Sequence, residues 1–338
     1  MATAKNFWTK LKKPIFALAP MANVTDAAFR RMFAECGAPD VFWTEFVSVE
    51  GLLSAGRERL LPDLWFSNGK GGAPSEHPIV AQIFGAKPEQ FEAVATLIRT
   101  LGFDGIDINM GCPDRAVEKQ GAGAGLIKNP KLAQEIVRAT KRGAGGLPVS
   151  VKTRIGYNKE QIDEWIPALL QEDLAALTVH LRTRKEMSLV PAHWELAPRI
   201  AALRSAHAPD TILLGNGDVS SLEDARARVA ASGFDGAMVG TSVFGNPWFF
   251  SGITPSLRER LERMVRHTEL FEQLYKSNLS KKNGGLKNFD VMKKHYKAYC
   301  SGFDGAKELR IQLMNTESAA EAKKITDEFL ATGKGYIK

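Results

Sequence analysis

The chain alternates short apolar runs with longer stretches whose apolar residues recur at helical spacing. The apolar runs are rich in β-branched residues and predict eight strands: Ile15–Ala19, Val41–Glu45, Ile79–Phe84, Gly105–Ile108, Val149–Lys152, Ala176–His180, Ile212–Leu214 and Ala237–Val239. The helical stretches between them are Ala27–Cys36, Pro88–Leu101, Pro130–Arg142, Ile162–Glu172, His193–Ala206 and Ser221–Ser232. Eight such repeats predict a closed (β/α)8 TIM barrel of the α/β class. A doubly wound open sheet is the alternative, but no GxGxxG follows the first strand.

The pattern changes after Phe250, where no convincing strand follows. Helices are predicted at Leu257–Tyr275, Asp290–Cys300 and Ala319–Leu330, with a polar, glycine-containing connection at Leu279–Asn288. We therefore predict a barrel over residues 1–250 and a small all-helical domain over residues 251–338.

Polar residues gather where the predicted strands end. In a TIM barrel these ends face one shared opening, where the active site lies. The residues are Pro20, Met21 and Ala22; Gln82; Asn109 and Cys112; Lys152 and Arg154; His180, Arg182 and Arg184; Asn216, Gly217 and Asp218; and Gly240, Thr241 and Ser242. Each alone could be a core polar group, a tight turn or a helix cap. Their convergence on one rim favours a ligand site.

Cys112 lies in the segment between Asp104 and Lys128, just after a buried strand and between Gly111 and Pro113. A free cysteine is most often a small, inert core residue. A packing cysteine needs no turn on both sides, so the Gly-Cys-Pro context favours a thiol presented for chemistry.

The last two strand ends predict a phosphate site, as is usual for these barrels. Backbone N–H groups at Gly217, Gly240 and Thr241 could hold a phosphate. With Gln82, Lys152 and His180 across the same opening, this set fits flavin mononucleotide (FMN). Gln82 would pair with the amide edge of the ring, and Lys152 would place positive charge near N1 and O2.

Charge is distributed unevenly along the 338 residues, which carry a net charge of +7. Residues 251–338 hold 17 Lys and Arg against 11 Asp and Glu, whereas residues 1–250 hold 28 against 27. A basic helical appendage suggests a polyanionic partner, and a solvated helical surface is the alternative. The three cysteines are far apart, which suggests a reducing compartment. No membrane span, metal motif or signal core is evident, so we expect a cytoplasmic protein, and we expect it to be a monomer.

Several segments together resemble the tRNA-dihydrouridine synthases. They are APMANVTDAAFR, AQIFG, DINMGCP, GAGAGL, VKTRIG, HLRTR, GNGDV and GFDGAMVGTSVFGNPW, in this order over the whole predicted barrel. That family has a flavin barrel followed by a helical RNA-contacting domain. The resemblance implies an FMN enzyme that reduces the C5=C6 bond of particular tRNA uridines, usually with NADPH.

Residue by residue, the resemblance assigns Cys112 as the catalytic acid and places Asn109 and Arg182 near the flavin and the uracil. It assigns FMN binding to Pro20, Met21, Ala22, Gln82, Lys152, His180, Asn216, Gly217, Asp218, Gly240 and Thr241. Two residues depart from the family pattern: Thr241 stands where Arg is usual, and Leu181 where Gly is usual. For tRNA backbone binding we predict Lys281, Lys282, Lys287, Lys293, Lys294 and Lys297, with the arginines of the helical domain.

Three other functions remain open from the residues alone. The nearest is an FMN barrel that reduces a free pyrimidine or an enone, similar to dihydroorotate dehydrogenase. A second is a non-redox barrel in which Lys152 forms a Schiff base with a sugar phosphate. A third is a non-catalytic RNA-binding protein that keeps the barrel as a scaffold.

Overall fold

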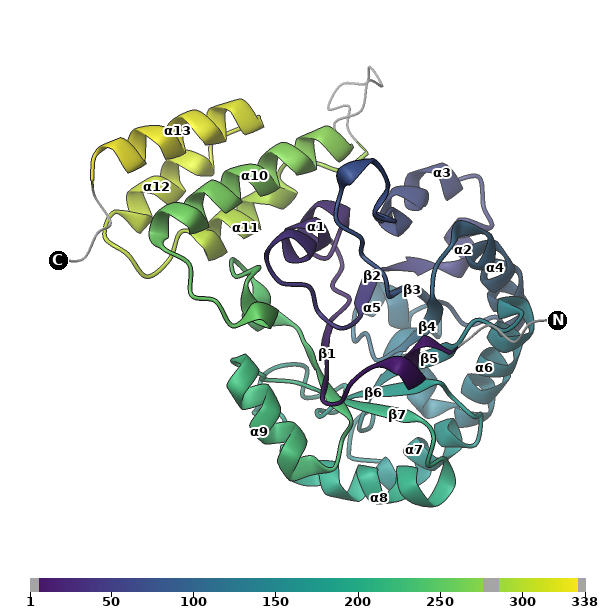
Figure 1. The fold of residues 1–338 in the computed structure, drawn as a ribbon. Coiled ribbons are helices and arrows are strands. Elements are labelled where there is room, and N and C mark those ends of the chain that lie inside the picture. The colour runs from purple at the N-terminus through teal and green to yellow at the C-terminus, as the bar shows by residue number, and fades with distance from the viewer. Residues whose placement is uncertain (1–5, 276–285, 334–338) are drawn as a thin grey trace. The chain divides into compact units, whose positions relative to one another are not determined.

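The computed structural model describes residues 6–275 and 286–333, and its strands form one parallel sheet (Figure 1). The strands are β1 (Ile15–Leu18), β2 (Phe42–Ser48), β3 (Ile79–Phe84), β4 (Gly105–Met110), β5 (Val149–Arg154), β6 (Ala176–His180), β7 (Ile212–Asn216) and β8 (Gly236–Val239). Their order is β1-β8-β7-β6-β5-β4-β3-β2. A parallel bridge between Ala17 and Val41 joins β1 to the chain entering β2. The predicted eight-stranded barrel is confirmed.

The strand bounds differ from the prediction mainly at the carboxyl ends. The strands β4, β5 and β7 run on to Met110, Arg154 and Asn216, two residues beyond the predicted ends. Asn109, Arg154 and Asn216 are therefore strand residues that pair with their neighbours, not the first residues of loops. The apolar pattern ends earlier than these three strands because their last two residues include polar site residues.

Helices alternate with the strands in the first of two compact units, which comprises residues 1–21, 39–64 and 77–240. They are α2 (Val49–Leu52), α3 (Arg57–Leu60), α4 (Pro88–Leu101), α5 (Arg115–Glu118), α6 (Pro130–Ala144), α7 (Ile162–Leu170), α8 (Ala197–His207) and α9 (Leu222–Ser232). The neighbours α4 and α6 approach closely at Gly143, where a Cβ would lie 2.0 Å from the Glu92 carbonyl oxygen.

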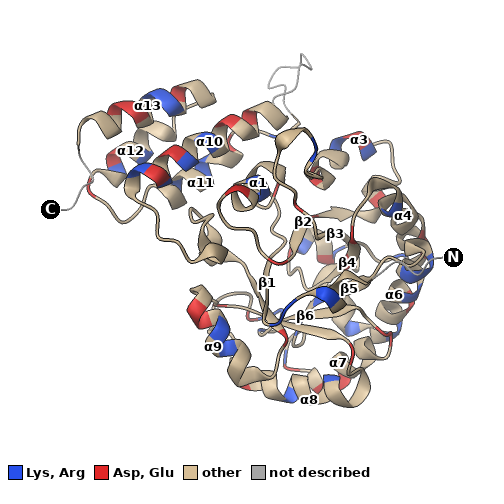
Figure 2. Cartoon of the chain, in the orientation of Figure 1, with Lys and Arg blue, Asp and Glu red and all other residues tan. Residues whose placement is uncertain are grey.

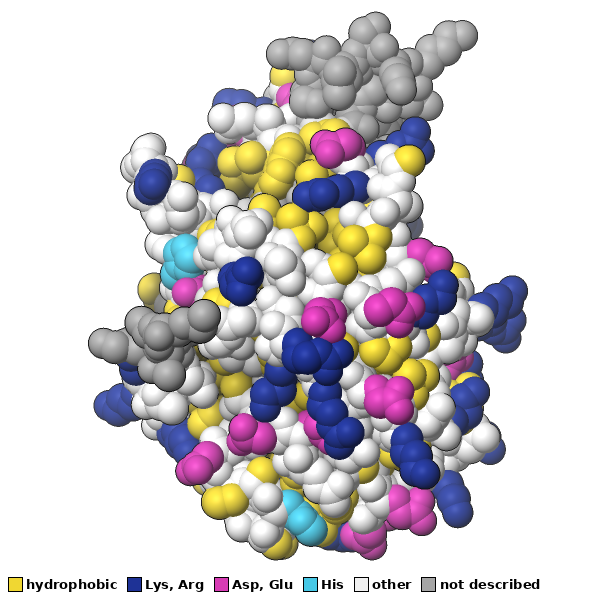
Figure 3. Space-filling view, turned by 90° about the vertical axis from the view of Figure 1, so that its right-hand side faces the viewer, with side chains coloured by type: hydrophobic (Ala, Val, Ile, Leu, Met, Phe, Trp, Pro, Cys, Tyr) yellow, Lys and Arg dark blue, Asp and Glu magenta, His cyan; other side chains and the backbone are white. Residues whose placement is uncertain are grey.

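The outer surface of these helices carries both basic and acidic side chains. Figure 3 views the side on which α4 and α6 lie in Figure 1, and it shows basic and acidic side chains interspersed. Arg142 on α6 pairs with Glu92 on α4 at 2.8 Å, and Arg138 pairs with Glu172 at 2.6 Å. The described residues of this face therefore form a mixed surface, unlike the single-signed patch that attracts a polyanion.

The second compact unit is helical and takes residues 22–38 and 65–76 as well as residues from 241 onward. It contains α1 (Ala27–Cys36), α10 (Leu257–Tyr275), α11 (Val291–Tyr299), α12 (Ala306–Leu313) and α13 (Ala319–Ala331). The units thus interleave along the chain, whereas the sequence prediction divided it once, near residue 251. The prediction also missed α12, whose eight residues start after Gly305 without a side-chain cap.

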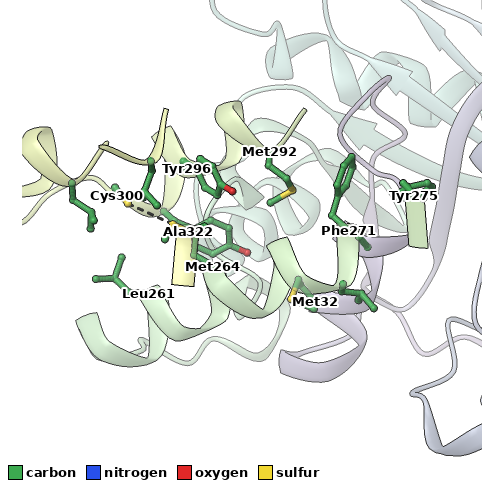
Figure 4. Packing of buried hydrophobic residues seen from close by; sticks show 14 of the residues in the cluster. Met32, Leu261, Met264, Phe271, Tyr275, Met292, Tyr296, Cys300 and Ala322 are labelled. Atoms are coloured by element: carbon green, nitrogen blue, oxygen red, sulfur yellow. Dashed lines mark hydrogen bonds between the residues drawn. The ribbon is translucent and has the colours of Figure 1, made fainter. Parts of the chain in front are cut away.

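Apolar side chains from α1 and the C-terminal helices form one core in this unit (Figure 4). Met32 of α1 belongs to it together with Leu261, Phe271 and Met292. The Cys300 thiol donates a hydrogen bond to Met264 Sδ at 3.6 Å. Cys300 is thus a buried packing residue of this core, as free cysteines usually are.

A buried ion pair joins two of the segments of the helical unit. Arg30 Nε lies 2.7 Å from Glu76 Oε2, and both side chains are completely buried. Arg30 also donates to the carbonyl oxygens of Thr25 and Trp65, and Glu76 accepts from the backbone N–H of Ser67. A buried pair is tolerable only with its remaining hydrogen-bonding capacity filled, and these bonds fill it here.

Two buried histidines pack edge to face in the same unit. The ring centroids of His267 and His295 are 4.7 Å apart, and their nitrogens have no hydrogen-bond partner among the described residues. Phe29 contacts both rings. Burial lowers the pKa of His267 to about 3, and burial with the neighbouring His267 and Lys294 lowers the pKa of His295 well below its usual value.

We predict that acid destabilises the helical unit through these histidines. Below about pH 6.5 the two histidines take up protons in the unfolded chain but stay neutral in the folded protein. The free energy of unfolding therefore falls as the pH drops, and it continues to fall toward the folded pKa of about 3. The slope is up to about 1.4 kcal/mol per pH unit for each histidine. Hydrogen exchange of α10 and α11 between about pH 7 and pH 4.5 should show this loss. In a His267→Leu/His295→Leu variant the slope should be clearly shallower, and an equal slope in both proteins would contradict the assignment.

Candidate active site

Polar side chains replace apolar ones on the inner face of the barrel as the strands approach their carboxyl ends. Deeper in the barrel, the buried core includes Val80, Ala176, Ile212 and Leu214. Gln82 lies two residues after Val80 on β3, and Asn216 lies two residues after Leu214 on β7. Side chains two apart lie on the same side of a strand, so the apolar residues form a floor beneath a polar layer.

The sheet register places these polar residues side by side. Gln82 is the register partner of Asp107, and Asp107 is the partner of Ser150. Two residues further along these strands, Asn109 pairs in register with Lys152. Residues of β3 to β5 that are distant in the sequence therefore meet in one cluster.

Cys112 sits on a loop that is held from three directions. Asn109 Oδ1 accepts hydrogen bonds from the backbone N–H groups of Gly111 and Cys112, at 3.1 and 2.9 Å. Arg154 Nε donates to the Gly111 carbonyl at 2.8 Å, and the Cys112 carbonyl accepts from Ala124 N at 2.9 Å. Gly123 permits that last approach, because its φ is +59° and a Cβ would lie 2.7 Å from the Cys112 oxygen.

The thiol of Cys112 is half-buried, unlike that of the fully buried Cys300. Burial raises the pKa of the Cys112 thiol above its usual value, and the cations Lys152 and Arg154 oppose this only weakly. The sulfur therefore keeps its proton at neutral pH. A protonated thiol at a strand end can act as an acid more readily than as a nucleophile.

Lys152 projects from β5 into the polar layer. Burial, with help from the neighbouring Arg154, lowers the pKa of Lys152 to about 8. Its Nζ donates to Asn216 Oδ1 at 3.1 Å, and Asn216 Nδ2 in turn donates to the Met238 carbonyl at 2.8 Å. The ammonium group is thus still mostly charged at neutral pH and is fixed in position by β7.

His180, Arg182 and Asp218 form a second polar group at the same end of the barrel. Arg182 Nη1 lies 3.1 Å from His180 Nε2, and Arg182 Nη2 donates to both Asp218 oxygens at 2.6 and 2.5 Å. Burial and the nearby cations lower the pKa of His180 well below its usual value, so Nε2 is a neutral acceptor. Burial works against ionisation of Asp218, but the hydrogen bonds from Arg182 and Ala192 lower its pKa.

The turn after β7 depends on an unusual backbone at Gly217 and Asp218, whose φ values are +122° and +52°. A Cβ at Gly217 would lie 2.8 Å from Ala192 Cβ and 3.1 Å from His180 Cδ2. Glycine at this position therefore lets the backbone approach the histidine ring closely. The turn itself is oriented by Trp194, whose Nε1 donates to the Gly217 carbonyl at 2.7 Å.

The structure brings together most of the predicted barrel residues. Gln82, Asn109, Cys112, Lys152, His180, Arg182, Asn216, Gly217 and Asp218 are linked by the register and contacts above, and Met21 Sδ lies 3.9 Å from the position of a Cβ on Gly240. Pro20 is buried next to Met21 in the chain. Leu181, which departs from the family pattern, is fully buried and its N–H donates to the Asn216 carbonyl.

Those of the remaining predicted residues that the structure describes belong to the helical unit. Ala22 and Thr241 are exposed, and their part in cofactor binding stays a prediction. Lys281 and Lys282 lie outside the described residues. Lys293 pairs with Asp290 at 2.5 Å, and Lys294 Nζ donates to the Asn23 carbonyl at 2.7 Å. Lys287 stacks over the ring of Tyr275.

Two residues of the site were not assigned a role from the sequence. Asp107 is completely buried and accepts hydrogen bonds from Ser150 and Gln82. Arg154 is buried and ties the Cys112 loop to the carbonyls of Thr183 and Met187. The sequence could have indicated Asp107 as a site residue, because a carboxylate inside an otherwise apolar strand is rare unless it has partners.

A groove between α11 and α12 has a different character. It is lined by Lys297, Ser301, Lys307, Arg310, Ile311, Met314 and Asn315, has a volume of about 690 Å³, and contains no carboxylate among its lining residues. Elsewhere on α10–α13 basic and acidic residues alternate (Figure 2), with ion pairs such as Lys323–Asp327 and Arg258–Glu262. The groove is therefore a place where positive charge is not matched locally.

Within residues 6–275 and 286–333, no helix is long and apolar enough to cross a bilayer. Over the same residues, no cluster of three or more His, Cys, Asp or Glu side chains is arranged to hold a metal ion.

Comparisons with known proteins point to one family. A model of the dihydrouridine synthase (Dus) family matches residues 17–333. A probable tRNA-dihydrouridine synthase of Staphylococcus aureus (strain Mu50 / ATCC 700699) is 43% identical over 331 residues, which cover 97% of this chain and 96% of that protein. Probable tRNA-dihydrouridine synthase 2 of Bacillus subtilis (strain 168) is 42% identical over 329 residues, covering 96% and 97%. A solved structure of a variant of NCR from Zymomonas mobilis aligns with 71% of this chain and 88% of its own, at a TM-score of 0.48 and 17% identity.

Proposed function

Because the chain belongs to the dihydrouridine synthase family, we propose that it reduces the C5=C6 bond of uridines in tRNA, with FMN as cofactor and NADPH as electron donor. One observation carries the proposal. A half-buried, protonated thiol, Cys112, stands at the end of the strand beside the one that carries Lys152, over a floor of apolar side chains.

The residues of the barrel fit a flavin. Among the described residues, Lys152 Nζ has one hydrogen-bond acceptor, Asn216, which leaves two of its three N–H groups for a ligand. Gly240 is partly exposed and leaves room where a side chain would stand, because a Cβ there would have no neighbour nearer than 3.9 Å. Gln82, Lys152, His180 and Asn216 would hold the ring, and backbone N–H groups at Gly217 and Gly240 would hold the phosphate. Pro20, Met21 and Asp218 are further proposed contacts within the barrel unit. The bound cofactor would supply the hydride that adds to C6 of the uracil.

The residues of the chain would supply the proton and the positive charge. Cys112 Sγ would donate its proton to C5, and the resulting thiolate would take a proton back from solvent before the next cycle. Lys152 and Arg154 would stabilise the negative charge that develops on the uracil carbonyl oxygen. Asn109 holds the backbone N–H of Cys112, which would keep the loop that carries the thiol in place while the base enters.

The uracil must leave its stack to reach a thiol at the open end of a barrel, which favours loop nucleotides. The groove formed by Lys297, Lys307 and Arg310 supports a contact with the tRNA backbone, because it combines unmatched cations with the exposed Ile311. Lys293 and Lys294 remain predicted contacts, although each already has a partner.

We predict that Cys112→Ala loses dihydrouridine formation by at least about 100-fold, the scale of a lost general acid. The variant should still bind FMN and still oxidise NADPH, because the thiol holds neither. Dihydrouridine in a tRNA transcript, measured by mass spectrometry, is the readout, and Cys36→Ala is the matched control. Turnover by Cys112→Ala at the wild-type rate would remove this thiol from the mechanism.

We predict that the purified protein is yellow and that Lys152→Met binds FMN about 10- to 100-fold more weakly, since a hydrogen bond to a charged group contributes about 1.5–3 kcal/mol. Titration of the flavin-free protein with FMN, followed by fluorescence quenching, measures this. Lys131→Met, at an exposed position on α6, serves as the control. A colourless protein that is trapped on Lys152 by borohydride with a sugar phosphate would favour the Schiff-base barrel instead.

We predict that Lys297→Gln/Lys307→Gln weakens tRNA binding and reduces the slope of log K against log salt by about 1–2, as expected for two lost phosphate contacts. Lys323→Gln/Lys324→Gln is the control, because those lysines pair with Asp327 and Glu328 on the same helix. Equal salt slopes for the two variants would show that the groove does not contact tRNA.

Activity on free uridine equal to that on tRNA would favour an enzyme of free pyrimidines. Deleting residues 251–338 would not separate the two functions cleanly, because α1 packs against α10 in one core and the deletion would expose that core.

A further inference from the structure

A chain of hydrogen bonds runs beneath the active site from a buried carboxylate to the backbone of Cys112. Ser150 Oγ and Gln82 Nε2 donate to Asp107 at 2.5 and 2.7 Å, Asn109 Nδ2 donates to Gln82 Oε1 at 3.1 Å, and Asn109 Oδ1 accepts from the N–H groups of Gly111 and Cys112. Asp107 and Gln82 are completely buried, and Asn109 is 6% exposed.

The direction of this chain is dictated at the Cys112 end. Backbone N–H groups can only donate, so the Asn109 atom that faces Gly111 and Cys112 must be the oxygen. The amide nitrogen of Asn109 then faces Gln82 and requires an acceptor, which turns the Gln82 oxygen toward it. The Gln82 nitrogen is left facing residue 107, and a buried N–H₂ there needs an acceptor in its turn.

Asp107 meets that requirement because an ionised carboxylate only accepts hydrogen bonds. Burial raises the pKa of Asp107 to about 6, against the hydrogen bonds of Ser150 and Gln82, so the group is still mainly ionised at neutral pH. An amide at position 107 could present either a donor or an acceptor, whereas the carboxylate presents only acceptors. The register of β3 to β5 puts Gln82, Asp107 and Ser150 abreast, which allows the direct hydrogen bonds from Gln82 and Ser150 to the carboxylate, and the Trp43 side chain also approaches that carboxylate.

We propose that Asp107 is a positioning residue that sets the orientation of the Gln82 and Asn109 amides and, through them, holds the Cys112 loop for proton transfer. Asp107 itself is completely buried, and its hydrogen bonds run to Gln82 and Ser150. Its effect on turnover rests on the proposed role of Cys112, but its effect on the loop does not.

The test changes the carboxylate at position 107 on β4 and the amide at position 82 on β3, first singly and then by exchanging the two. In Gln82→Glu two buried carboxylates would face each other, and in Asp107→Leu the Gln82 nitrogen would lose its acceptor. Either change should misorient Asn109. In Asp107→Asn/Gln82→Glu the amide introduced at position 107 can donate to the carboxylate introduced at position 82. That carboxylate can still accept from Asn109, so the downstream direction is restored with the same net charge.

The readout is the rate at which iodoacetamide alkylates Cys112 in the as-purified protein, with Cys36 of the same chain as the internal reference in peptide mass spectrometry. Gln82→Glu and Asp107→Leu should each raise this rate about two- to tenfold, the range for one net hydrogen bond. The double variant should return close to the wild-type rate, which a role in filling space alone would not produce.

The outcomes separate this inference from the proposed function. Wild-type alkylation rates in both single variants, or a double variant as fast as Gln82→Glu, would overturn the positioning role. Should Asp107→Leu fail to fold, the pair Gln82→Glu and Asp107→Asn/Gln82→Glu still decides the matter. Full activity in Cys112→Ala would overturn the proposed function while leaving the alkylation result intact.

Discussion

The hydrogen-bond direction imposed by two backbone N–H groups, those of Gly111 and Cys112, constrains the buried polar side chains of β3 and β4 and the loop beyond them. Parallel register places Gln82, Asp107 and Ser150 abreast, and burial leaves them no water to correct a wrong orientation. A buried polar network of this kind is stable only when every member is satisfied, so its geometry is nearly unique. The Cys112 loop takes its position from that network, in addition to its own turn residues.

The cations around the thiol act in the same confined space. Lys152 and Arg154 both have pKa values lowered by burial, to about 8 and about 10, yet both remain charged at neutral pH. Each is oriented by oxygen acceptors: Lys152 by Asn216, and Arg154 by the carbonyls of Gly111, Thr183 and Met187. Charges fixed in this way need little reorganisation when negative charge develops on a substrate.

The helical unit combines an apolar core with a few buried polar groups. Its core is apolar, with Met264, Phe271 and Met292 among its members, but the unit also encloses the Arg30–Glu76 pair and two histidines. The ion pair has its hydrogen bonds filled, whereas the histidine nitrogens have no partner among the described residues. The first arrangement links segments from distant parts of the sequence, and the second makes the unit sensitive to acid.

The sequence was enough to predict the fold class, because alternating apolar strands and amphipathic helices in eight repeats can pack in only a few ways. It also predicted the candidate site residues Gln82, Cys112, Lys152 and Asn216, since polar residues at strand ends are exceptions to the apolar pattern. Tertiary structure alone decided that residues 22–38 and 65–76 join the C-terminal helices, and that α12 forms. It also decided that Arg182 is engaged by Asp218 and that Asp107 supports the Cys112 loop. The physical reason is that residue type predicts burial and chemistry, whereas register and packing decide which partners meet.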